Sequence, residues 1–162
     1  NPESRLQVKQ ALTTLRDTIR LSLKKNISFL SESLADWRVE IAERTELVGV
    51  ELIWLQEESV DIIQLSTYQL LDLSQILREL VSNALKHAHP RYIKVQIVIL
   101  DKQQLNLTLM HDGQIATPEH WHDGTGMHSI RTRLHRLKGK ISILLTMQPE
   151  PQLCINIVLP II

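Results

Sequence analysis

The amino-acid sequence predicts an α+β fold, a two-layer sandwich in which helices cover one face of a mixed, mostly antiparallel sheet. One observation behind this prediction is the order of apolar patterns along the chain. It runs helix, helix, strand, helix, two strands, loop, helix, two strands. A second observation is that four of the strand segments come in two pairs with short connections, as antiparallel strands do. Sheets built mainly from hairpins, with helices gathered on one face, form such sandwiches.

The composition is that of an ordinary soluble globular protein, with 162 residues, 43% hydrophobic and 22% charged. The formal net charge of +0 argues against nucleic-acid binding driven by bulk charge. The single cysteine, Cys154, lies in an apolar run, so we expect a buried, unreactive thiol. No segment reaches the roughly 18 consecutive apolar residues of a membrane span. The chain begins with Asn1 and shows no signal peptide, so we expect a segment of a longer protein.

The N-terminal part, residues 1–44, is predicted to be helical. A first helix over 5–25 and a second helical stretch have apolar residues at three-four spacing: Val8, Leu12, Leu15 and Ile19, then Ile27, Leu30, Leu34 and Trp37. Long amphipathic helices need a surface to pack against, and the sequence offers no third helix beside them. We therefore expect a missing partner helix or a second subunit.

Residues 45–162 are predicted to form the sandwich. In the segment 47–55 the residue types alternate as in a strand, so a strand is predicted there. In 67–88 the apolar residues return to the spacing of a helix. Two strand pairs are predicted, at 92–100 with 104–110 and at 139–147 with 153–160. A loop over 111–125 and a short helix over 126–138 lie between the pairs.

The predicted helix ending at residue 88 has a polar stripe opposite its apolar face. The apolar face comprises Leu73, Leu77, Leu80, Val81, Ala84 and Ala88. The polar stripe comprises Glu79, Asn83, Lys86 and His87. Spacing alone favours a face that is only solvated. Asparagine is a poor helix former, however, so an asparagine in the middle of a helix indicates a further function for Asn83. The carboxamide suits a hard cation, the lysine suits phosphate and the glutamate suits a base.

The stretch DGTGMHSIRTRLHRL (123–137) places two glycines directly before a helix. Glycine lets the backbone approach a ligand closely, and the first amides of a helix favour anions. Arg131 and Arg133 in the next turns are predicted to be either phosphate contacts or solvated charges.

Together these segments resemble the ATP-binding catalytic domain of sensor histidine kinases, of the GHKL superfamily with the Bergerat fold. RELVSNALKHA (78–88) looks like the N box, MHDGQ (110–114) like the first glycine box and GTGMHSIRTRLHRLKGKI (124–141) like the second. The resemblance covers about residues 45–160. In addition, residues 6–23 resemble the second helix of the dimerisation and phosphotransfer hairpin. The most similar subfamily has short lids and response regulators of the NarL/LuxR type.

The resemblance implies a site for ATP and Mg²⁺. Asn83 would hold Mg²⁺, Glu79 would polarise the phosphoacceptor histidine, and residues 114–123 would form the nucleotide lid. The nucleotide itself would contact Asn83, Lys86, His87, His111, Asp112, Gly113, Gly124, Thr125, Gly126 and Met127.

The resemblance also implies an activity and partners. The expected enzyme is a protein histidine kinase that passes the γ-phosphoryl group to a histidine outside this chain, and thence to a NarL/LuxR-type response regulator. No histidine precedes His87, so we expect no phosphorylation of this chain by itself. We also expect a homodimer through the N-terminal helices, no nucleic-acid partner and a cytoplasmic location. Whether the parent protein is anchored in the inner membrane stays open.

The first glycine box departs from the family pattern Asp-x-Gly-x-Gly. Its leading Asp, which reads the adenine amino group, is replaced by His111, and its second glycine by Ile115. Asp112 is adjacent, but a shift of one residue on a strand turns its side chain to the other face. An alternative is therefore a pseudokinase, a docking module with a degenerate nucleotide pocket.

Two further alternatives are open. Four histidines close in sequence could form a metal site: His111, His120, His122 and His128. An anti-sigma-type serine kinase of the same superfamily is the other, although the long helix before Arg44 argues against it.

Overall fold

A computed structural model describes residues 1–101, 103–114 and 127–161. The helical elements are α1 (Pro2–Lys25), α2 (Leu30–Leu47), the 3-10 helix η1 (Glu58–Ile62), α3 (Thr67–Asn83), the π-helix η2 (Ala84–Ala88) and α4 (Met127–Arg136). The strands are β1 (Ile27–Phe29), β2 (Glu51–Gln56), β3 (Gln64–Ser66), β4 (Tyr92–Leu100), β5 (Gln104–His111), β6 (Lys140–Thr146) and β7 (Gln152–Pro160). The predicted α+β sandwich is confirmed.

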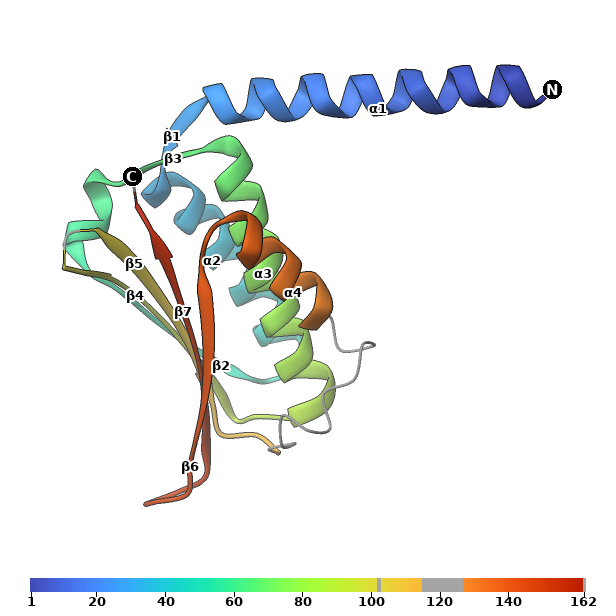
Figure 1. Ribbon diagram of the computed structural model, residues 1–162. Coiled ribbons are helices and arrows are strands. Elements are labelled where there is room, and N and C mark those ends of the chain that lie inside the picture. Colours follow the sequence, from blue (N-terminus) through green and yellow to red (C-terminus); the bar gives the residue numbers. More distant parts are fainter. Residues whose placement is uncertain (102, 115–126, 162) are drawn as a thin grey trace.

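The main sheet has five strands in the order β2-β4-β5-β7-β6. Only the β2–β4 pairing is parallel, and the other three are antiparallel. Alternate residues of β4, β5 and β7 face inward and are buried, which is why these segments alternate in sequence. Helices α2, α3 and α4 cover this face, and the core lies between the two layers (Figure 1).

Helix α1 projects away from this body (Figure 1), and none of its side chains is buried. It connects to the body through a two-stranded sheet in which Ile27 pairs with Ser66 and Phe29 with Gln64. In addition, the Thr67 backbone N–H donates to the Asn26 carbonyl oxygen at 2.9 Å. We call this junction, residues 24–29 with 64–69, the hinge. In the described parts of the chain, no helix combines the length and apolar character needed to cross a bilayer.

Several predicted boundaries were wrong. The second helix begins at Leu30 rather than near Ile27, because residues 27–29 pair with β3. The first core strand begins at Glu51, since α2 runs to Leu47 and the chain turns at Gly49 with a positive φ of 72°. The helix predicted to reach residue 88 stays α-helical to Asn83 and continues as a π-helix.

Candidate functional site

Helix α3 organises the candidate site, since it packs against the core, α2 and α4 and also carries the polar stripe. A capping box begins the helix: the Ser66 hydroxyl accepts from the Gln69 N–H at 3.1 Å, and the Gln69 side chain accepts from the Ser66 N–H at 2.9 Å. One side is the predicted apolar face, whose six residues are all buried in the core.

A second side of α3 contacts α2. Arg78 donates to both carboxylate oxygens of Glu40, at 2.9 and 3.0 Å, which lowers the pKa of that carboxyl. One turn later, Arg44 donates to the Ser82 hydroxyl at 2.7 Å. These contacts fix the rotation of α3 about its axis and leave the polar stripe facing away from α2.

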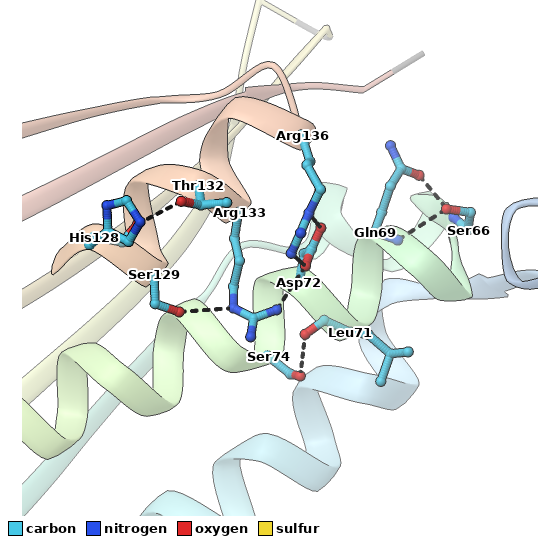
Figure 2. Close-up of polar contacts among 10 residues, drawn as sticks. All are labelled: Ser66, Gln69, Leu71, Asp72, Ser74, His128, Ser129, Thr132, Arg133 and Arg136. Atoms are coloured by element: carbon cyan, nitrogen blue, oxygen red, sulfur yellow. Dashed lines mark hydrogen bonds and ion pairs between the residues drawn. The ribbon is translucent and has the colours of Figure 1, made fainter. Parts of the chain in front are cut away.

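The face of α3 that carries the polar stripe contacts α4 near the start of the helix, through Asp72, which is only 3% exposed. Arg133 donates to its carboxylate at 3.0 Å, and Arg136 donates twice, at 2.7 and 3.1 Å (Figure 2). Asp72 lies early in α3 whereas Arg136 ends α4, so the two neighbouring helices run antiparallel (Figure 1). Met127, the buried first residue of α4, is therefore directed toward the Asn83 end of α3.

The sequence analysis did not single out Asp72. The signal that was available is an acid within an otherwise apolar stretch, together with Arg133 and Arg136 three residues apart on one helix face. Arg133 was predicted to be a phosphate contact or a solvated charge, and the structure instead pairs it with Asp72 and with the Ser129 hydroxyl at 3.3 Å. Arg131 is exposed.

The polar stripe stays accessible. Glu79 and Asn83 are half-buried, and Lys86 and His87 are exposed. None of the four side chains forms a hydrogen bond or ion pair with another described residue. Lys86 and His87 lie on the π-helix, a conformation that occurs frequently at functional sites.

His111 ends β5 on the inner face of the sheet and is 3% exposed. Burial lowers the pKa of its imidazole and outweighs the opposing effect of the nearby Asp112 charge, so the ring is neutral. Its Nδ1 accepts a hydrogen bond from the Gly113 N–H at 3.1 Å. The proton of the neutral ring is therefore on Nε2, which is a hydrogen-bond donor.

Asp112 points elsewhere, as the alternation of a strand predicts. Its carboxylate accepts from the Arg91 and Tyr92 backbone N–H groups at 2.8 and 3.2 Å and from Arg91 Nε at 2.8 Å. Burial would raise its pKa, but these hydrogen bonds and the Arg91 charge hold it below its ordinary value. The structure thus gives Asp112 a role in joining the ends of β4 and β5, and its nucleotide contact stays a prediction.

Gly113 allows two segments of the backbone to come into contact. A β-carbon at this position would lie 2.4 Å from the Ala88 carbonyl oxygen, closer than any real contact. Directly after it, the Gln114 N–H donates to that same oxygen at 2.6 Å. The end of β5 is thereby fixed against the end of the π-helix, which brings His111 and the polar stripe to one end of the sandwich.

Some predicted residues lie outside the described parts of the chain: Gly124, Thr125, Gly126 and, apart from Gln114, the whole predicted lid. His120 and His122 of the proposed metal site lie there too. Among the described residues, no group of three or more metal-ligating side chains comes together. His111 is buried in the sheet and His128 is exposed on α4.

Comparisons with known proteins give matches of structure only. No family model matches the sequence, and no curated protein does. Among solved structures, the *Erythrobacter litoralis* EL346 blue-light activated histidine kinase matches 85% of this chain with a TM-score of 0.68 and 16% identity. The chain spans 47% of that protein, about half its length.

Two further solved structures agree with this match. *Acinetobacter baumannii* histidine kinase AdeS matches 98% of this chain and 83% of its own, with a TM-score of 0.66 and 17% identity. The nucleotide-free catalytic domain of histidine kinase ThkA matches 84% of this chain and 95% of its own, with a TM-score of 0.65 and 16% identity. The chain therefore has the fold of histidine kinase catalytic domains.

Proposed function

We propose that this chain is the ATP-binding catalytic domain of a two-component sensor histidine kinase. Its task is to transfer the γ-phosphoryl group of ATP to a histidine outside this chain, from which a NarL/LuxR-type response regulator receives it. The observation that carries this proposal is the polar stripe of α3. Two of its side chains are exposed and two are half-buried, and none is paired with another described residue, beside the end where α4 begins.

The residues of the stripe fit ATP and Mg²⁺ in chemical type. Asn83 offers a carboxamide oxygen with no hydrogen-bond partner among the described residues, and so would hold Mg²⁺. Lys86 and His87, one turn further on, would meet phosphate oxygens, as would the backbone of residues 124–127. Bound Mg²⁺ supplies neutralisation of the phosphate charge during transfer.

Glu79 lies one helical turn before Asn83 and would act on the incoming histidine. Its carboxylate would accept the N–H of one imidazole nitrogen and so leave the other nitrogen with a free lone pair. That nitrogen forms the bond to the γ-phosphorus as the bond from phosphorus to the β–γ bridging oxygen breaks and ADP leaves. Positioning and charge neutralisation provide most of the rate in such transfers.

One observation favours the alternative, a docking module with a degenerate nucleotide pocket. The Nε2–H of His111 is a hydrogen-bond donor. The adenine amino group that the family resemblance assigns to this position is a donor as well, and two donors do not pair. The measurement that separates the two functions is nucleotide binding with and without Mg²⁺.

We propose that the parent protein is a homodimer through its N-terminal helices. The support is α1 itself, which buries no side chain and exposes an apolar stripe. An apolar stripe of this length on a helix that projects from its domain needs a partner surface.

The test compares two substitutions on the stripe. Asn83→Ala should abolish the Mg²⁺-dependent part of ATP binding measured by calorimetry, because it removes the predicted metal ligand. Glu79→Gln should leave ATP affinity nearly intact. It should slow transfer to a supplied upstream helix bearing a histidine by about 100-fold, the effect of a lost general base. Gln75→Ala, a carboxamide removal about 12 Å along α3 from Asn83, is the matched control.

The proposal fails if the unmodified chain gives no Mg²⁺-dependent heat with ATP or ADP at millimolar concentration, and the docking module then stands. If Glu79→Gln and Asn83→Ala weaken binding equally, Glu79 is a structural residue of the pocket. If neither substitution changes transfer, the stripe is only a solvated helix face.

A further inference from the structure

The hinge contains a cavity of about 460 Å³, remote from the polar stripe. It lies where the end of α1, the β1–β3 sheet, the first turn of α3 and the last turn of α4 meet. Six of its lining residues are Lys24, Ile27, Ser66, Tyr68, Gln69 and Arg136. Tyr68 and Asn83 are fifteen residues apart on α3, which corresponds to about 22 Å along the helix, so this cavity is separate from the proposed nucleotide site.

The cavity has a positive charge. Lys24 contributes one cation from α1 and Arg136 another from α4, and none of its lining residues is acidic. Asp72, which does not line the cavity, is shared by Arg133 and Arg136, so this three-residue cluster keeps one net positive charge. Lys24 adds a second, and no described carboxylate forms an ion pair with it.

Several polar atoms that line the cavity remain available as donors. Arg136 uses Nε and one terminal nitrogen, Nη2, on Asp72, and its Nη1 has no hydrogen bond to a described residue. The acceptor oxygen of Gln69 is occupied by the Ser66 N–H, which leaves the Gln69 amide nitrogen. The Ser66 oxygen already accepts from the Gln69 N–H, which leaves its hydroxyl proton (Figure 2). Free donors beside two cations suit an anion.

Tyr68 lies beside both cations of the cavity. Lys24 Nζ lies 5.4 Å from the centre of its ring, and the guanidinium carbon of Arg136 lies 6.0 Å from it. Two like charges that line one cavity repel, and an anion bound in the cavity would offset that repulsion. Because one cation belongs to α1 and the other to the body, such an anion would also tie the two parts together.

We propose that the hinge cavity binds a phosphate group, a small anion with two negative charges, and that the bound group fixes α1 relative to the kinase body. This inference concerns a site outside the proposed nucleotide pocket and does not depend on ATP binding. The phosphate can be a free ion or a phosphoryl group on a small metabolite, and the chemistry that recognises it is the same.

Calorimetric titration of the full chain with inorganic phosphate tests the proposal. Lys24→Gln should weaken binding at least tenfold. The neighbouring Lys25→Gln, which removes the same charge from a residue that does not line the cavity, should leave it unchanged. Acetate, with one charge, should bind more weakly than phosphate, and glycerol phosphate should bind as phosphate does if organic esters fit. Phosphate should also slow hydrogen exchange of the β1 amides, except in Lys24→Gln.

Three results would overturn the proposal: no phosphate binding at tens of millimolar, equal losses in the Lys24 and Lys25 variants, or unchanged hydrogen exchange in β1. Lys86→Gln separates the two sites, because it removes the proposed phosphate contact of the nucleotide site and should leave phosphate binding at the hinge intact. If it abolishes phosphate binding, the anion occupies the nucleotide site and the hinge proposal is wrong. If ATP fails to bind but phosphate binds through Lys24, the proposed function fails and the hinge site stands.

Discussion

His111 shows how one buried side chain can make the stability of the whole domain depend on pH. Burial lowers the pKa of its imidazole below the ordinary value of 6.5, so the folded state stays neutral while the unfolded state takes up a proton. The stability that the neutral His111 ring contributes to the folded state is fully present above pH 6.5 and is lost as the pH falls below that value. The slope has a limit of about 1.4 kcal/mol per pH unit for one proton.

We therefore expect His111→Gln to flatten the dependence of the unfolding free energy on pH below about pH 6.5, measured by urea denaturation. The comparison concerns the slope, since the substitution also changes packing. His135→Gln, on the exposed side of α4, is the control and should keep the slope of the unmodified chain. If the His111 variant keeps the slope of the unmodified chain, folding does not lower the pKa of the His111 imidazole.

The sequence predicts the chemical types of the site residues, and the sides of the strand that they face, better than it predicts their functions. The alternation of β5 correctly predicts that His111 and Asp112 face different sides. The Nδ1 contact of His111 could not be predicted, because it depends on the turn that brings the Gly113 N–H back to the ring. The contact of Gly113 with Ala88 joins segments 25 residues apart and has no local signal.

Among the elements, the contact between α3 and α4 depends most on one buried charge. Asp72→Asn should lower the unfolding free energy by about 2 kcal/mol, because it leaves two arginines without their anion. The loss stays below that of a fully buried pair, since the Arg133 and Arg136 side chains are 29% and 34% exposed. Denaturant unfolding measures this change.

Glu40→Gln is the matched control, since Glu40 and Arg78 join α2 to α3 in a similar bidentate arrangement. Both side chains of that pair are about 40% exposed, and exposed pairs contribute less than about 1 kcal/mol. Equal effects of the two substitutions would show that burial of Asp72 does not strengthen the α3–α4 contact.

The long elements were predictable because their apolar periods extend over several turns or alternations, as in α3, β4, β5 and β7. The three-residue strands β1 and β3 were not, because segments this short show no period and are defined only by their pairing. The π-helix follows the same apolar pattern as an α-helix for one turn, so its sequence did not reveal it.

On the scale of the whole molecule, α1 is the helix whose apolar stripe stays exposed in the described chain. Leu12 and Leu15 are 52% and 56% exposed in its apolar stripe. If two copies pair through this stripe, Leu12→Lys should weaken the dimer at least tenfold in sedimentation experiments, because burial of a leucine contributes about 1.5–3 kcal/mol. The thermal unfolding of the body should not change, since Leu12 contacts none of it.

Gln10→Lys is the control, because Gln10 lies on the opposite side of α1 and its substitution by lysine adds the same charge. A dimer that both substitutions weaken equally would respond to charge alone. A monomer at all concentrations would mean that another helix covers the stripe.

The length of α1 makes it a lever arm. A helix of 24 residues is about 36 Å long, and a rotation of about 10° at the hinge moves its far end by about 6 Å. That displacement is sideways and exceeds one helical pitch of about 5.4 Å. A change at the hinge too small to disturb the core of the body is thus amplified, along a rigid rod, into a sideways movement large enough to separate the far end of α1 from a helix that packs against its stripe.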